Sequence, residues 1–342
     1  MKALVTGGYF DQGGDGVVWL VDLAAERAEV LLRWTPPAHL RVPTKGFAGG
    51  SLGADGLLYV AAHAAVVRID PVRAEVTGVL HQPCMNDLHH VAAIDDRLHV
   101  SNTGLGAVDV LDLDGRFLGS HALLPAWANA RRIQGDDFPA EAPPVRPGWS
   151  GEPPAPWSER REDDGYHTTD RRSAPFHRLK VPDHLHVNHV AQVGGRLLAT
   201  CFADGALREL SGFDLAARLD GHFLHDGIVH DDAFWLTAID GSVIELDAGT
   251  LRERRRIDAF APGHYGWCRG LAVTDNHLAV GLTEVRRGRL PRHRWADREP
   301  DGSETSVLLL DRRDGRLLSR VELSDEVRHT KLYSVLPIEV TA

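Results

Sequence analysis

The chain has 342 residues, of which 43% are hydrophobic and 25% charged, with 34 glycines and 19 prolines. This composition is typical of a globular protein with many turns, and it excludes a disordered, collagenous or coiled-coil chain. The acidic residues outnumber Lys and Arg by 48 to 38, which argues against nucleic acid and anionic membranes as general partners. The sequence has no membrane-spanning apolar run and no signal-peptide pattern, so we expect a soluble, cytoplasmic protein.

A pattern of four short β-rich runs, separated by glycine and aspartate turns, recurs along the chain. Copies of the pattern start at Asn86, His184, Leu224 and Tyr265, and an earlier copy starts at Phe47. The turn between the third and fourth runs repeatedly contains aspartate and glycine. A repeat of about 40 residues with four strands is the signature of a β-propeller blade. The sequence therefore predicts five complete blades.

The two ends of the chain supply the strands of a sixth blade. The N-terminus has three β-rich runs, ALVTGG, VVWLVDL and AEVLLRW, and the C-terminus has one unpaired run, LYSVLPIEV. Pairing the last strand with the first three closes the ring and removes an exposed sheet edge. We therefore predict an all-β protein, a six-bladed β-propeller of four-stranded blades that forms a single domain over residues 1–342. A β-sandwich is the alternative, but it would not need the same order of four runs each time.

Two long stretches interrupt the repeat, and both are predicted to lie on one face of the propeller, the top face. Residues 125–182 hold more than half of the prolines together with Trp149 and Trp157. We expect this stretch to lack regular structure and to pack down as a lid, a floppy linker being the alternative. Residues 286–304 are rich in arginine and include Arg292. This local positive charge suggests an anionic ligand, although a solvated loop fits the sequence equally well.

The chain is rich in histidine, with 19 residues, and several of them align between repeats. The alignment brings His89 or His90, His189, and His225 with Asp226 to one level, at the start of strands that line the channel of a propeller. Imidazole nitrogens beside a carboxylate are common ligands of Fe, Mn, Zn and Cu, so these residues predict a site for one divalent metal ion. The alternative is a wet channel whose histidines are only hydrogen-bonded. Four other histidines, on outer strands or loops, are expected at the surface: His39, His99, His121 and His277.

One blade carries a resemblance to a known family. The run HDGIVH from His225, followed by FWLT and VIELD, resembles a blade motif of the gluconolactonase and senescence-marker-protein propellers. The resemblance implies a six-bladed fold with a divalent metal held by a Glu, two Asn and an Asp that is also the catalytic base. Asp226 matches that Asp, whereas histidines stand near the two Asn positions and residues 46–51 lack the family's Glu motif. A transition metal is therefore favoured over calcium. Repeats of the NHL type match the blades about as well and imply binding without catalysis.

These features together predict a metal-dependent enzyme that acts on a small polar, anionic metabolite, with hydrolase or lactonase chemistry favoured by the resemblance. An oxidoreductase, lyase or isomerase with a His-rich metal site is an alternative, and so is a non-catalytic propeller that binds a protein or carries a ligand. Arg269, Arg292, Trp149 and Trp157 are candidates for substrate binding. The candidates for catalytic proton transfer are Asp226, His186, His230 and Lys331.

Overall fold

The structure, a computed structural model, consists of β-strands with only two short 3₁₀ helices among the residues described. It describes residues 1–10, 13–43, 45–122, 146–147, 175–179, 185–212, 214–219, 223–285, 303–323 and 329–338. Three of the predicted binding residues, Trp149, Trp157 and Arg292, lie outside these ranges. No helix in the described part of the chain is both long enough and apolar enough to cross a bilayer.

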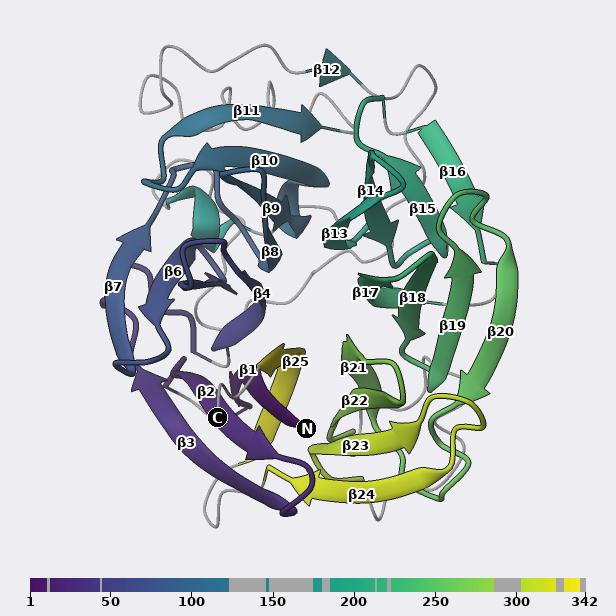
Figure 1. Cartoon of the computed structure of the whole chain (residues 1–342). Coiled ribbons are helices and arrows are strands. Elements are labelled where there is room, and N and C mark those ends of the chain that lie inside the picture. The colour runs from purple at the N-terminus through teal and green to yellow at the C-terminus, as the bar shows by residue number, and fades with distance from the viewer. Residues whose placement is uncertain are drawn as a thin grey trace. The chain divides into compact units, whose positions relative to one another are not determined.

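Six antiparallel sheets follow one another along the chain, and they are the blades of a six-bladed β-propeller (Figure 1). The chain divides into two compact units, residues 1–35, 44–47 and 222–342 in the first, and 36–43 and 48–221 in the second. Each unit contains three blades. The predicted fold class is confirmed, while the single domain over residues 1–342 stays a prediction.

The first unit contains the blade that joins the two ends of the chain and the last two complete blades. The joining blade has the strand order β25-β1-β2-β3, and the other two are β17-β18-β19-β20 and β21-β22-β23-β24. Their strands are β1 (Lys2–Tyr9), β2 (Gly16–Asp22), β3 (Arg27–Trp34), β17 (Leu224–His230), β18 (Ala233–Ala238), β19 (Ser242–Asp247), β20 (Glu253–Asp258), β21 (Trp267–Val273), β22 (His277–Thr283), β23 (Ser306–Asp311), β24 (Leu317–Glu322) and β25 (Thr330–Ile338).

The second unit contains three blades that are consecutive in the sequence. Their orders are β4-β5-β6-β7, β8-β9-β10-β11 and β13-β14-β15-β16, with the short β12 added in parallel to β11. The strands are β4 (Phe47–Leu52), β5 (Leu58–Ala62), β6 (Ala65–Asp70), β7 (Glu75–Leu80), β8 (Leu88–Ile94), β9 (Arg97–Asn102), β10 (Ala107–Asp112), β11 (Phe117–Ala122), β12 (Arg146–Pro147), β13 (Val187–Val193), β14 (Arg196–Cys201), β15 (Ala206–Glu209) and β16 (Asp214–Arg218).

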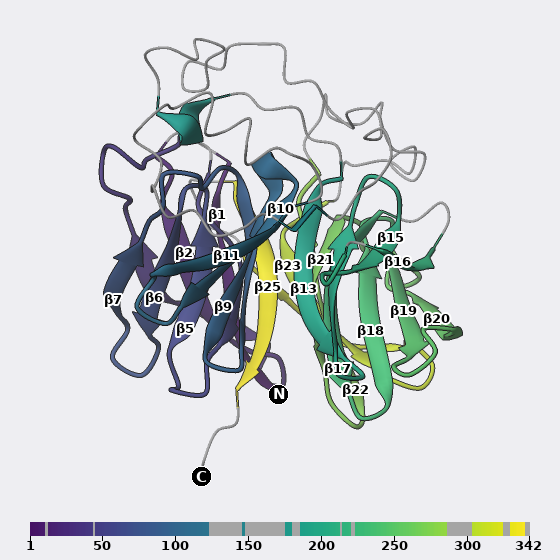
Figure 2. The ribbon, with the colours of Figure 1, turned by 90° about the horizontal axis from the view of Figure 1, so that it is seen from above.

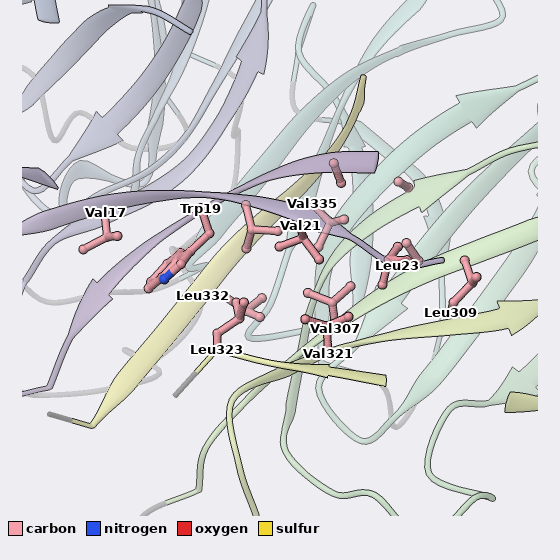
Figure 3. Close-up of a cluster of buried hydrophobic side chains, with 14 of the residues drawn as sticks. Val17, Trp19, Val21, Leu23, Val307, Leu309, Val321, Leu323, Leu332 and Val335 are labelled. Carbon is pink, nitrogen blue, oxygen red and sulfur yellow. The ribbon is translucent and has the colours of Figure 1, made fainter. Parts of the chain in front are cut away.

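The C-terminal strand completes the blade formed by the three N-terminal strands, as predicted. β25 runs antiparallel to β1, with Lys2 opposite Ile338, so β1 begins and β25 ends at the same end of this blade (Figure 2). Apolar side chains of this blade pack against those of β21–β24 in one buried cluster (Figure 3). Trp19 and Val21 of β2 contribute to this cluster, and so does Leu332 of β25. Each fully buried side chain of this size stabilises the fold by roughly 1.5–3 kcal/mol.

The repeated aspartate turns have a clear physical role. In five blades, the aspartate that ends the third strand accepts hydrogen bonds from backbone N–H groups of the turn that follows. Asp70 Oδ1, for example, accepts from the N–H groups of Val72 (2.9 Å) and Arg73 (3.0 Å). The five aspartates are Asp22, Asp70, Asp112, Asp247 and Asp311. Such side-chain contacts replace the backbone partners that a tight turn lacks, which is why the motif recurs in the sequence.

Short regular elements occur within the proline-rich stretch 125–182, which was expected to have none. They are β12 and a 3₁₀ helix at Phe176–Arg178. Asn86 Nδ2 donates to the carbonyl oxygens of Phe176 (2.8 Å) and Leu179 (3.1 Å), and both of these apolar side chains are buried. Local hydrogen bonding and burial thus override the proline content at this point. The prediction that the whole stretch forms a lid stays a prediction.

Candidate functional site

We call the first strand in the order given for each blade its leading strand. A β-bulge recurs in these leading strands. In five blades, one extra residue of the leading strand interrupts its pairing with the second strand. The interruption falls at His89 in β8, Asn188 in β13, His225–Asp226 in β17, Gly270 in β21 and Tyr333 in β25. A bulge bends the strand and changes the direction of its side chains, and bulges are common beside functional sites. The polar residues singled out from the sequence gather at these bulges.

In the first unit, His225 and Asp226 form a buried hydrogen-bonded pair at the bulge of β17. His225 Nδ1 lies 2.9 Å from Asp226 Oδ2, and the two residues are 4% and 6% exposed. Because a carboxylate can only accept, Nδ1 carries the proton and Nε2 carries the lone pair in the neutral ring. The Asp226 backbone N–H donates to Thr237 Oγ1 (3.1 Å) on the second strand of the blade. The pair is therefore held both by its own strand and by the neighbouring one.

A second donor to Asp226 comes from the next blade of the same unit. The backbone N–H of Gly270, at the bulge of β21, donates to Asp226 Oδ2. Gly270 has φ +70°, and a Cβ at this position would lie 3.0 Å from the Val335 nitrogen and 3.1 Å from the Ser334 carbonyl carbon. Only glycine adopts this conformation without strain at such close backbone approach. Glycine at this position therefore allows the close backbone approach that brings the N–H of residue 270 to the Asp226 carboxylate.

Two side chains of the first unit, those of Arg269 and His225, lie near Tyr333, the bulge residue of β25. The Arg269 guanidinium carbon lies 4.6 Å from the centre of the Tyr333 ring and 5.5 Å from that of Trp267. The centre of the His225 ring is 6.1 Å from that of Tyr333. Arg269 and Tyr333 are both half-buried. The predicted substrate-binding arginine therefore lies beside the His225–Asp226 pair, with two aromatic residues that the sequence reasoning did not identify.

The other two catalytic candidates of this unit, Lys331 and His230, have different surroundings from the His225–Asp226 pair. The Lys331 ammonium lies over the Phe10 ring, 5.5 Å from its centre, and the residue is 3% exposed. His230 ends β17, four residues after Asp226, and a strand rises about 3.3 Å per residue, so about 13 Å separates their backbones. Its Nε2 instead faces Asp275 Oδ1 (3.1 Å) and Asp231 Oδ2 (3.4 Å). His230 is therefore not part of the group around Asp226.

In the second unit, the predicted histidines form two ring pairs between β8 and the start of β13. The ring centres of His90 and His189 are 3.9 Å apart, and those of His89 and His186 are 4.5 Å apart with the rings nearly perpendicular. The alignment of repeats left open whether His89 or His90 lies level with His189. In the structure, both contact a histidine of the neighbouring blade, His89 with His186 and His90 with His189. His186 has φ +53°, an uncommon conformation for a residue with a side chain. Backbone strain of this kind is concentrated at functional sites.

Buried polar groups continue from these histidines. His89 Nδ1 lies 2.9 Å from the Asp87 carbonyl oxygen, and the Asp87 carboxylate lies 3.4 Å from His63 Nδ1. His63 Nε2 lies 2.9 Å from the carbonyl oxygen of His177. Burial, with a contribution from His63, lowers the pKa of His177 to about 4. This network ties the leading strand β8 to the described end of the 125–182 stretch.

His99, expected at the surface, is instead buried at 5% exposure on β9. Desolvation, with smaller contributions from His121 and Arg97, lowers its pKa to about 4. His99 was expected on an outer strand or loop, but it lies on the second strand of its blade, which is covered on both faces, and a histidine there is desolvated. The expectation for His99 was therefore wrong.

The predicted metal ligands do not all belong to one unit. His89, His90 and His189 lie in the second unit, and His225 and Asp226 in the first, so the five-residue ligand set stays a prediction. Among the described residues, the one group of three whose ligand atoms all lie within 4.8 Å of each other is His230, Asp231 and Asp275. That group is largely exposed and lies at the other end of β17.

Comparison with known proteins supports the fold and nothing finer. No family model matches the chain, and no curated protein matches it. A protein of unknown function from Bacteroides caccae has a similar structure, with 12% identity, a TM-score of 0.60 and coverage of 99% of both chains. A chain in the crystal structure of a nidogen/laminin complex matches with 11% identity and a TM-score of 0.53, over 96% of this chain and 97% of that one. At such identities the likeness shows the β-propeller fold alone.

Proposed function

We propose that this protein is a hydrolase of small polar, anionic metabolites, with lactone or ester hydrolysis as its reaction and His225 as its general base. The observation that carries the proposal is the hydrogen bond from His225 Nδ1 to the buried Asp226 carboxylate. A carboxylate that fixes one nitrogen of an imidazole leaves the other with a defined lone pair, which is the arrangement of general bases in hydrolases. The resemblance of this blade to the gluconolactonase type points to the same chemistry.

The proposed reaction needs one proton taken up and one proton returned. His225 Nε2 takes a proton from a water molecule, whose oxygen attacks the carbonyl carbon of the lactone or ester. When the carbon–oxygen bond of the ring or ester breaks, the imidazolium gives its proton to the departing oxygen. Asp226 holds the tautomer throughout and stabilises the imidazolium, while the Gly270 N–H and Thr237 keep Asp226 in place. The products are the carboxylic acid and the alcohol.

A divalent metal ion at the leading strands remains a separate proposal. Its support lies in the second unit, in the pairing of His90 with His189 and of His89 with His186. Within either unit, however, the described residues at these bulges do not place three ligand atoms within 4.8 Å of one another. No step of the proposed reaction therefore passes through a metal. An oxidative, lyase or isomerase reaction would belong to a metal-loaded form of the protein.

The test is turnover of a panel of sugar lactones and small carboxylate esters, followed by proton release above the spontaneous rate. We expect wild-type protein to hydrolyse at least one member, and His225→Ala to lower kcat by roughly 10²–10⁴, the usual contribution of a general base. His230→Ala is the matched control, because it removes a histidine from the far end of the same strand, and it should leave kcat unchanged. Equal turnover by His225→Ala and wild type would refute His225 as the general base. No turnover of any member would refute the hydrolase and favour a non-catalytic binding propeller.

A further inference from the structure

Arg269 is a partly buried arginine whose guanidinium has no carboxylate partner in the described part of the chain. Its Nε is buried and makes no hydrogen bond, and no acidic group among the described residues lies within 4.0 Å of it. What lies against the guanidinium is aromatic, Tyr333 at 4.6 Å and Trp267 at 5.5 Å. Aromatic rings attract a cation, but they supply no oxygen acceptor for the buried Nε–H of Arg269.

Three other arginines removed from solvent in the described part of the chain are paired with carboxylates. Arg255 is a close counterpart in the same unit, since its guanidinium carbon also lies over an aromatic ring, 5.2 Å from the centre of Trp235. Arg255, however, donates through Nε (3.0 Å) and Nη2 (2.7 Å) to Glu245. Arg208 likewise donates to Asp204 at 2.6 Å, and Arg320 to Glu304 at 2.6 Å. Arg269 differs from these three arginines in having no carboxylate partner among the described residues.

We propose that Arg269 binds the carboxylate of the substrate. The substrates would then be small carboxylic acids that also carry a hydrolysable lactone or ester. A partly desolvated charge is costly unless an opposite charge pairs with it, so the missing acceptor comes from the ligand. The planar N–H groups of arginine match the two oxygens of a carboxylate. Identifying the bound carboxylate as the substrate's rests on the proposed function.

The surrounding charges favour a carboxylate over a phosphate. The residue next to Arg269 is Gly270, whose N–H already holds the Asp226 carboxylate. Arg269 carries one positive charge, and the nearby Asp226 carboxylate would repel a second negative charge on a ligand, so a singly charged carboxylate suits the position better than a doubly charged phosphate. The position also suits the reaction, since Arg269 and His225 both lie against Tyr333, at 4.6 and 6.1 Å. We infer that a small molecule whose carboxylate is held at Arg269 extends past Tyr333 toward His225.

The experiment measures binding without turnover. Acetate, L-lactate, L-malate and D-gluconate are titrated into wild-type protein by calorimetry at constant ionic strength, beside their neutral amides and inorganic phosphate. We expect at least one carboxylate to bind and Arg269→Gln to weaken it by roughly ten- to hundredfold, because hydrogen bonds to charged groups contribute about 1.5–3 kcal/mol. Arg269→Lys, which keeps the charge and loses the planar fork, should recover only part of the affinity. Arg255→Gln is the matched control and should bind as wild type does.

The outcomes separate this proposal from the hydrolase. Binding that is unchanged in Arg269→Gln, absent for every carboxylate, or stronger for phosphate would overturn the assignment of Arg269. His225→Ala should still bind the carboxylate, since the imidazole is not its partner. If Arg269 binds a carboxylate but wild type turns over no substrate, the hydrolase fails and the binding site stands; normal turnover in His225→Ala removes only the role of His225. If His225→Ala loses turnover and Arg269→Gln binds normally, the reverse holds.

Discussion

The replacement of Asp109 by Asn is expected to stabilise this protein at neutral pH. Asp109 lies on β10, is 0% exposed, and accepts hydrogen bonds from Asn102 Nδ2 (2.7 Å), Ser120 Oγ (2.8 Å) and the Cys84 thiol (3.8 Å). Desolvation outweighs these three donors and raises the pKa of Asp109 to about 6, from 3.8. The folded protein therefore binds this proton more tightly than the unfolded chain does.

The sign and size of the effect follow from proton linkage. Because the folded pKa of Asp109 is raised, its contribution to stability is complete below pH 3.8 and is lost as the pH rises through 6. A shift of about two units corresponds to about 3 kcal/mol of stability lost by pH 7. An asparagine in the same place can accept from Asn102 and Cys84 with its oxygen, and its amide can donate to Ser120, whose hydroxyl rotates to accept. Asp109→Asn keeps the contacts and removes the buried charge.

Chemical unfolding of both proteins between pH 4 and 7.5 measures the effect. The free energy of unfolding of Asp109→Asn minus that of the wild type should rise by about 2.4 kcal/mol between pH 4 and pH 7, and other titrating groups cancel in the difference. If the whole chain unfolds together, the melting temperature at pH 7 should rise by roughly 4 °C. Asp109→Ala is the control, since it leaves Asn102 and Ser120 without their acceptor and should destabilise at all pH values. A difference between Asp109→Asn and wild type that does not change with pH would refute the raised pKa.

Three further predictions concern the histidines, the bulges and the metal. Burial lowers the pKa of His177 in the folded protein to about 4, so its contribution to stability is present above pH 6.5 and is lost as the pH falls through 4. In His177→Gln, the slope of the unfolding free energy against pH should be shallower by up to about 1.4 kcal/mol per pH unit in this range. Gly270→Ala should lower the free energy of unfolding by at least about 1–2 kcal/mol in denaturant titrations, because alanine is strained at φ +70° and its Cβ meets the backbone of Val335. Gly263→Ala is the control: this glycine also has a positive φ but lies in open space, so the variant should show only the smaller conformational cost. Elemental analysis of untagged protein should find near-stoichiometric Fe, Mn, Zn or Cu that His189→Ala lacks; equal metal content in the two proteins, or none in either, would contradict the metal proposal.

The blades could be predicted from the sequence because their signals are local. The alternation of apolar residues and the aspartate that accepts hydrogen bonds from its own turn depend on residues only a few positions apart. The unpaired strands at the two ends of the chain each lack one partner, so their pairing could be predicted as well. The same reasoning placed His225 beside Asp226 and brought His90 and His189 to one level. It failed for His99, whose burial depends on what covers the second strand, and it assigned His230 to a site that lies at the other end of its strand.

The bulges could not be predicted, because an extra residue in a polar stretch leaves the apolar alternation on either side intact. Without them, the alignment of repeats could not decide between His89 and His90, and it gave no reason to single out Tyr333. The structure shows that the bulge recurs in five leading strands while its residue differs in each, a histidine, an asparagine, a His–Asp pair, a glycine and a tyrosine. These five blades thus share the bulge in the backbone, but they differ in the side chain that the bulge presents. A resemblance carried by blade motifs therefore predicts the fold, whereas the ligands and the reaction depend on the one residue per blade that the motif does not specify.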